Sequence, residues 1–239
     1  MEVADSLQPL LADEDPDVRV DTMQAFLRCA RVEDAVIVRA SLVGDPEFDV
    51  KKAALGVLAK LADTESVDLL CALASSRCNE SISWDESAHG WDEWLDLQPC
   101  VVHALATIGD DRCIETLLAI REDESVLDLD GLVFKALLQL GNTGVQSALE
   151  FLDDSDSAVR AQAVRVFANA SPDLLAGHLE TLLCASDASL RILAITSGVC
   201  EPANLRDRML NDAEAGVRMA AVEQVARRYD PAERALSES

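Results

Sequence analysis

The sequence is poor in aromatic residues, glycine and proline. Aromatic residues make up 4% of the 239 residues, and there are 10 glycines and 7 prolines in a chain whose apolar fraction is 49%. That apolar fraction consists mainly of Ala, Leu and Val. Sheets usually recruit aromatic and β-branched residues, whereas closely packed helices do not need them. The composition therefore predicts an all-α fold, and the length allows a substantial buried core.

Long apolar runs and paired cysteines are also missing. No run of about 18 apolar residues occurs, which argues against a membrane-spanning helix. The first residues, MEVADSLQPLLADED, are acidic where a signal peptide would be basic, so we predict a cytoplasmic protein. The seven cysteines stand singly, without a CxxC pair, which agrees with a reducing compartment and argues against a zinc site.

Positive charge is scarce. The chain has 44 acidic residues against 20 Lys and Arg, a net charge of −24, and only four of the bases are Lys. Such a surface repels phosphate backbones and anionic lipid headgroups, so we predict a basic protein partner and no direct contact with nucleic acid or membrane. Adaptation to a salty cytoplasm would produce the same excess of acids, and composition does not separate the two explanations.

A short phrase recurs along the chain: an acidic turn, an apolar residue followed by a base, and then an Ala-rich helix. It appears as DPDVRVDTMQAFLRCA, DPEFDVKKAALGVLAKLAD, DSDSAVRAQAVRVFANA, SDASLRILAITSGV and DAEAGVRMAAVEQVARR. Apolar residues within each phrase follow helical spacing, as in Val50, Ala54, Val57 and Leu58. The bases that mark the phrase are Arg19, Lys51, Arg160, Arg191 and Arg218.

A second phrase joins one Ala-rich helix to the next helix. LAKLADTESVDLL aligns without a gap with LATIGDDRCIETL, and LLQLGNTGVQSAL matches both with a small slip. The anchors Leu61, Ile108 and Leu140 are 47 and 32 residues apart. The longer spacing indicates that an acidic, Trp-rich segment at 78–95 is inserted into an otherwise regular array.

These phrases resemble HEAT repeats, in the short form of the phycobilisome-lyase-type HEAT-like family. The resemblance covers the chain outside the insertion and implies a right-handed α-α superhelix of about seven helical pairs. We expect one solenoid domain over residues 1–230, followed by a flexible tail at 231–239. Proteins of this kind serve as scaffolds, adaptors or inhibitors, and the lyase-type members imply handling of an open-chain tetrapyrrole.

The repeated Asp and base have a structural interpretation. An Asp before the Ala-rich helix caps it, and the following base reaches a carboxylate or carbonyl of the next unit, which forms a ladder along the array. The predicted ladder consists of Asp17, Arg19, Lys51, Arg160, Arg191 and Arg218.

Signals for catalysis are weak. The sequence has no P-loop, GxGxxG, HExxH or GxSxG motif. Cys100 and His103 have helical i, i+3 spacing but no third residue to orient them. Acidic and His residues of the insertion could ligate a metal, but they lack the alternating spacing of a calcium loop. DNA glycosylases built on HEAT-like repeats need a basic groove, whereas residues 78–111 contain no Lys or Arg. We therefore predict a non-enzymatic protein without a cofactor or metal.

The stretch SISWDESAHGWDEWLD of the insertion contains all three tryptophans of the chain and no Lys or Arg. The tryptophans could fold back and pack on the solenoid, anchor a partner, or form a lid over a small molecule. We predict a partner-binding segment that recognises a basic protein, in the manner of an inhibitor or immunity protein. The alternative is a lyase-type or maturation scaffold for a bilin-bearing protein. The predicted contact residues are Trp84, Asp85, Glu86, Trp91, Asp92, Glu93 and Trp94.

Overall fold

The computed structural model describes residues 3–77, 82–85, 93–122 and 129–229, and over these ranges the chain is helical with no strand. Its contacts divide it into two compact units, Met1–Val145 and Gln146–Ser239, which are described separately below. No helix in the described ranges has both the length and the apolarity needed to cross a bilayer.

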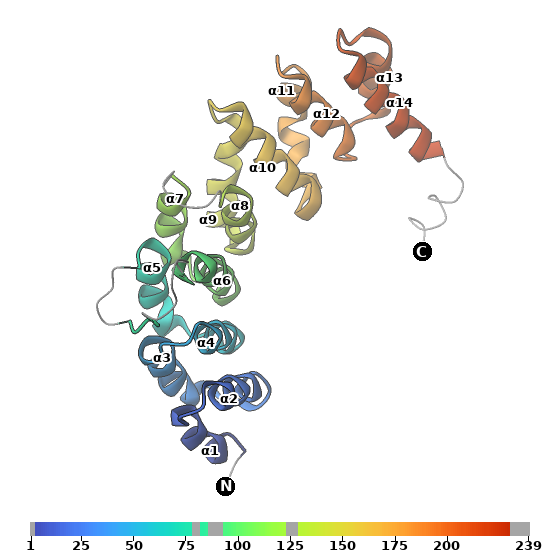
Figure 1. Cartoon of the computed structure of the whole chain (residues 1–239). Helices are drawn as coiled ribbons and strands as arrows, with labels where there is room; N and C mark the ends of the chain where they lie inside the picture. Colours follow the sequence, from blue (N-terminus) through green and yellow to red (C-terminus); the bar gives the residue numbers. More distant parts are fainter. Residues whose placement is uncertain (1–2, 78–81, 86–92, 123–128, 230–239) are drawn as a thin grey trace. The chain divides into compact units, whose positions relative to one another are not determined.

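The first unit is built from stacked helical pairs. In Figure 1, α2, α4, α6 and α8 lie one above another along one side, and α3, α5 and α7 line the other side. Short 3-10 turns introduce α3, α5 and α7. The helices are α1 (Val3–Leu7), α2 (Pro16–Cys29), α3 (Ala35–Gly44), α4 (Phe48–Leu61), α5 (Val67–Ser75), α6 (Glu93–Ile108), α7 (Ile114–Arg121) and α8 (Asp130–Gln139).

The second unit repeats this pattern. Here α10 packs on α12, and α12 packs on α14, while α11 and α13 contact the helices that follow them. The helices are α10 (Ser157–Ala170), α11 (Leu179–Leu183), α12 (Ala188–Thr196), α13 (Pro202–Asn211) and α14 (Ala215–Tyr229). The helix α9 (Gly141–Glu150) spans the boundary between the two units.

The described elements confirm the predicted fold of about seven helical pairs. The residues expected to face the core are buried, including Val50, Ala54 and Leu58 in α4 and Ala163 and Phe167 in α10. The insertion lies between the two helices of the third pair, since α5 ends at Ser75 and α6 begins at Glu93. The tail at 231–239 lies outside the described residues.

Helices end at a repeated left-handed position. Gly109 follows α6 with φ +78°, and Gly141 follows α8 with φ +66°. In the aligned phrase of the second pair this position is Ala62, which adopts φ 50° at the end of α4. A residue with a Cβ is strained there, so Ala62 is a local departure from the repeat that costs some stability.

Candidate partner-binding site

In four of the repeats, the Arg of the recurring phrase donates hydrogen bonds to the turn that precedes its own helix. The Nη1 atoms of Arg19, Arg191 and Arg218 donate to the carbonyl oxygen six residues earlier at 2.9, 2.7 and 2.7 Å, and Arg160 donates to the corresponding carbonyl of Asp154. Each Arg also reaches the carbonyl five residues earlier. The Arg side chain therefore closes the acidic turn that precedes its helix.

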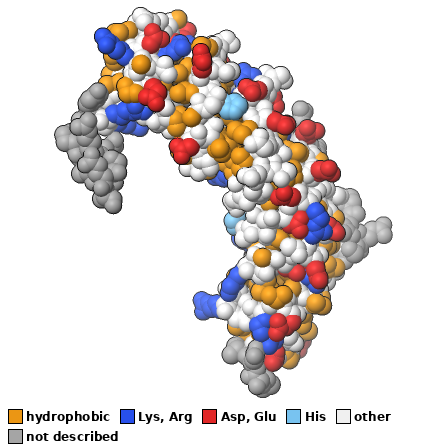
Figure 2. Space-filling model, turned by 180° about the vertical axis from the view of Figure 1, so that it is seen from behind, with side chains coloured by type: hydrophobic (Ala, Val, Ile, Leu, Met, Phe, Trp, Pro, Cys, Tyr) orange, Lys and Arg blue, Asp and Glu red, His pale blue; other side chains and the backbone are white. Residues whose placement is uncertain are grey.

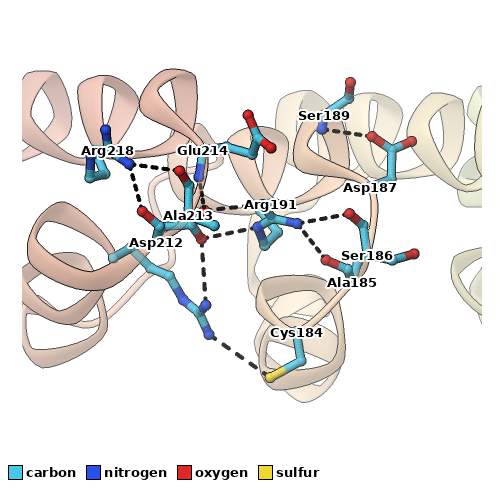
Figure 3. Close-up of polar contacts among 11 residues, drawn as sticks. Cys184, Ala185, Ser186, Asp187, Ser189, Arg191, Asp212, Ala213, Glu214 and Arg218 are labelled. Carbon is cyan, nitrogen blue, oxygen red and sulfur yellow. Dashed lines mark hydrogen bonds and ion pairs between the residues drawn. The ribbon is translucent and has the colours of Figure 1, made fainter.

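At two of these positions the Arg side chain also forms an ion pair with a carboxylate of the next helical pair. Arg19 forms a two-pronged ion pair with Asp45, with Nε–Oδ2 at 2.6 Å and Nη2–Oδ1 at 3.0 Å. Arg191 pairs in the same way with Asp212, with both distances at 3.0 Å (Figure 3). The carboxylates are 6% and 2% exposed, so these are buried ion pairs in which each charge is neutralised by its partner.

The pKa values of the paired groups reflect these contacts. The hydrogen bond with Asp45 raises the pKa of Arg19, although burial opposes it. Burial by itself would raise the pKa of Asp212. The hydrogen bonds from Arg191 and from the Glu214 backbone N–H, with nearby Arg charges, outweigh burial and lower it.

Two parts of the predicted ladder need correction. The residue that caps α2 is Asp15, whose side chain accepts from the Asp17 backbone N–H at 3.0 Å; Asp17 is the second residue of the helix, two residues past the cap position. Among the described residues, Arg160 and Arg218 donate hydrogen bonds only to the turns before their own helices. They therefore do not connect to a following helical pair. The partner carboxylates Asp45 and Asp212 were missed, although their spacing of six residues before the next base is visible in the sequence.

Lys51 occupies the ladder position in the second pair but behaves differently. It is fully buried and its Nζ donates to the Leu42 carbonyl oxygen at 2.9 Å, not to a carboxylate. Burial lowers the pKa of Lys51 from 10.5 to about 8, and the charges of Asp45 and Glu93 only partly offset this. The ammonium lies 5.2 Å from the centre of the Trp84 ring.

Trp84 therefore covers the ammonium at a place where Arg19 and Arg191 meet a carboxylate. The segment 82–85 is attached to the end of α3 because the Ser83 N–H donates to the Val43 carbonyl oxygen at 2.8 Å, and Ile82 is buried. The Arg77 guanidinium lies 5.7 Å from the same ring. The Trp84 side chain is half-buried, and its Nε1 is buried without a hydrogen-bond partner among the described residues.

Carboxylates from three segments lie close enough together to affect the pKa of Glu93. Burial raises the pKa of Glu93 at the start of α6, and the negative charges of Asp85, Glu47 and Asp49 raise it further, while Arg77 opposes them. Glu93 therefore lies within electrostatic range of three other carboxylates and of Arg77. We call the residues Glu47, Asp49, Arg77, Trp84, Asp85 and Glu93 the Trp84 cluster.

Trp94 lies apart from this surface. It is 8% exposed, and its Nε1 donates to the Leu73 carbonyl oxygen at 2.7 Å. One turn later, Gln98 Nε2 donates to the Ala74 carbonyl oxygen at 2.7 Å. These bonds satisfy carbonyls at the end of α5 that have no partner within their own helix. Trp94 thus packs on the repeat array with most of its side chain buried.

The other predicted contact residues divide between the cluster and the undescribed ranges. The cluster brings Trp84, Asp85 and Glu93 together with Glu47, Asp49 and Arg77. No pattern in the sequence predicts that these last three residues belong to the group. Glu86, Trp91 and Asp92 lie outside the described residues.

Cys100, one of the candidate catalytic residues, lies in α6 and is half-buried. Burial raises the pKa of the Cys100 thiol, which opposes formation of the nucleophilic thiolate. His178 Nδ1 lies 3.8 Å from an Asp153 carboxylate oxygen, far from Cys100 in the sequence. In the described ranges, no group of three or more His, Cys, Asp or Glu side chains is arranged to hold a metal ion.

Solved structures, but no known protein family, are similar to this chain. No family model matches it, and a search of curated proteins found no match. Among solved structures, it is similar to the complex of CpcE and CpcF of phycocyanin lyase from Nostoc sp. PCC7120, with 14% identity, 96% of this chain and 89% of that chain covered, and a TM-score of 0.45. Two engineered proteins match at 17% and 15% identity, covering 95% of this chain in both cases and 68% and 98% of theirs, with TM-scores of 0.36 and 0.35.

Proposed function

We propose that this chain is a non-enzymatic helical-repeat protein that binds a basic protein partner through the Trp84 cluster. The observation that carries the proposal is the electrostatic coupling of Glu47, Asp49 and Asp85 to Glu93, beside the half-buried Trp84 that precedes Asp85. Carboxylates held together in this way repel one another, and a Lys or Arg of a partner relieves that repulsion. An indole at the centre supplies apolar area and a face for the cation.

The charge of the first unit favours the same partner. Residues 1–145 contain 29 acidic residues and 11 Lys or Arg, a net charge of −18, whereas residues 146–239 contain 15 and 9, a net charge of −6. On the face shown in Figure 2, carboxylates are interspersed with apolar side chains. A strongly negative unit raises the association rate of a basic protein, and the cluster then fixes where it docks.

Inhibition is the biological role that fits this surface best. A basic surface that binds nucleic acid could be occluded by an acidic solenoid that imitates the charge of its normal ligand. The same contact would serve an immunity or antitoxin protein. The runner-up is a maturation scaffold for a bilin-bearing protein, and visible absorbance in the purified native protein would favour it.

The test compares partner capture from native lysate by matched variants. Trp84→Ala and the double variant Glu47→Gln/Asp85→Asn alter the cluster. Asp173→Asn/Glu180→Gln removes the same charge from exposed positions of the second unit. Circular dichroism establishes that each variant is folded.

We expect both cluster variants to weaken binding of a basic partner by at least about tenfold, and the control to change it less than about twofold. Binding should also weaken steeply with salt. Equal losses in the cluster and control variants would show that net charge alone attracts the partner. Unchanged capture by Trp84→Ala would remove the cluster from the contact.

A further inference from the structure

A cleft of about 400 Å³ in the second unit surrounds the guanidinium of Arg160. It is lined by the turn before α10 and by the end of α11 with the following turn, including Asp154, Cys184, Ala185 and Ser186. The first unit has an equivalent cleft of about 550 Å³ around Arg19. The two clefts correspond residue by residue in the repeat, because Leu11, Asp13, Ser41, Gly44 and Asp45 occupy the positions of Leu152, Asp154, Thr181, Cys184 and Ala185.

One substitution distinguishes the two clefts. In the first, Asp45 supplies the carboxylate that Arg19 grips with Nε and Nη2. In the second, that position is Ala185, which has no polar side chain. Arg160 Nη1 is occupied by the carbonyls of Asp154 and Ser155, but Nε and Nη2 have no partner among the described residues.

The orientation of Arg160 is nevertheless fixed as in the complete pairs. Its bonds to the carbonyls six and five residues earlier are the ones that Arg19 and Arg191 also make while they hold a carboxylate. A guanidinium held by Nη1 presents its other edge, with two parallel N–H groups, to the cleft. This edge matches a carboxylate in geometry and charge.

We propose that the Arg160 cleft binds a carboxylate carried by a ligand, in the place that Asp45 and Asp212 fill from within the chain elsewhere. Arg208 Nη2 lies 3.9 Å from the sulfur of Cys184, which lines the cleft, but Arg208 Nη1 lies 3.5 Å from Asp212 Oδ2, so that carboxylate already shares its charge. The neighbouring acids are partly engaged: Asp154 accepts the Asp156 N–H at 2.8 Å, and Asp153 lies 3.8 Å from His178. The bound group is an acidic side chain of a protein or a free carboxylate, and the chemistry of recognition is the same.

The experiment follows the Arg160 Nε–H resonance by NMR during titration with acetate or with an acetylated, amidated Gly-Asp-Gly peptide. Ala185→Asp restores the internal carboxylate of the repeat. Ser186→Asp adds the same charge one residue along and controls for electrostatic repulsion. Arg160→Lys identifies the resonance and removes the paired donors.

We expect saturable shifts of the Arg160 resonance in the wild type, loss of at least about tenfold in affinity in Ala185→Asp, and a smaller loss in Ser186→Asp. Ala185→Asp should also raise Tm by about 2–4 °C, because a half-buried pair is completed, whereas Ser186→Asp should not. Binding of both probes identifies a site for carboxylates in general, and binding of the peptide alone identifies a site for protein side chains.

Two results would overturn the proposal. One is a linear, unsaturated response to both probes in the wild type. The other is an affinity that Ala185→Asp leaves unchanged, since a carboxylate at that position must compete if the guanidinium edge is the site.

Discussion

Arg19 and Lys51 hold the same position in consecutive repeats, yet they reach opposite solutions to the burial of a cation. Arg19 satisfies its guanidinium with two carbonyls and a two-pronged carboxylate from the next unit. Among the described residues, Lys51 has one carbonyl contact and an indole face, and its pKa falls to about 8. The segment bearing Trp84 supplies the indole face, whereas Asp92, the residue that aligns with Asp45 in the next pair, lies outside the described residues.

The contrast teaches how a repeat array acquires a specific site. Where the repeat is regular, its charges are consumed in holding neighbouring units together. Where the segment bearing Trp84 enters, Trp84 covers the base, and several carboxylates nearby raise the pKa of Glu93. Where a single residue departs, as at Ala185, the Arg keeps its position but loses its internal partner.

Breaking the regular pair should have the largest effect. Arg19→Met leaves the Asp45 carboxylate buried without its guanidinium, and we expect a loss of about 3–5 kcal/mol in the free energy of unfolding, measured by urea denaturation. Arg28→Met, on the exposed side of the same helix, is the matched control and should change stability by less than about 0.5 kcal/mol. Similar small losses in both variants would show that the Arg19–Asp45 pair is not needed for the stability of this unit.

At the Lys51 position, loss of the positive charge should stabilise the folded chain, whereas at the Arg19 position it should destabilise it. Because the pKa of Lys51 is about 8 in the folded chain and near 10.5 when unfolded, the unfolded state binds more protons between these values. Stability should therefore rise from about pH 8 to pH 10.5, by on the order of 1–3 kcal/mol relative to Lys51→Met. Lys52→Met, which alters the exposed neighbour, should retain the rise.

Removal of the aromatic cover should sharpen the comparison at the same position. Trp84→Ala admits water to the ammonium, so we expect the pKa of Lys51 to move back toward 10.5, as measured from the pH dependence of its side-chain carbon and nitrogen resonances. A pKa that stays near 8 would mean that burial by the helices, not by Trp84, is responsible.

The cap of α2 provides a smaller effect that separates two neighbouring acids. Asp15→Ala removes the acceptor for the Asp17 N–H and should cost about 1 kcal/mol in chemical denaturation. Asp17→Asn removes only a charge in the first turn and should cost about 0.3–0.5 kcal/mol. Equal costs would contradict the assignment of Asp15 as the cap.

The left-handed position at Ala62 should give the smallest change, and in the stabilising direction. Ala62→Gly places at this position the residue that Gly109 and Gly141 supply in the aligned phrases, and we expect a gain of about 0.5–1 kcal/mol in thermal denaturation. Gly109→Ala is the reciprocal variant and should lose a comparable amount.

Much of this architecture could be predicted from the pattern of apolar residues and turns. Val50, Ala54 and Leu58 recur at helical spacing, and a helix with such a stripe must bury it on neighbours, so the stacked pairs follow from the sequence. The spacing of the aligned phrases also predicted an insertion at 78–95, much of which lies outside the described residues. The roles of the tryptophans could not be predicted, because Trp84 and Trp94 have similar acidic neighbours in sequence but different surroundings in space.

The sequence by itself determined the helical repeat, the positions of its bases and the place where the array is interrupted, since these depend on local periodicity. Tertiary packing determines which base pairs with a carboxylate, which contacts an indole ring and which does neither among the described residues. Those outcomes depend on residues more than 20 positions apart, as in Arg19 with Asp45, Lys51 with Trp84 and Arg160 with Ala185. Packing brings such residues together, and the free energy of a buried charge depends on whichever neighbour packing supplies.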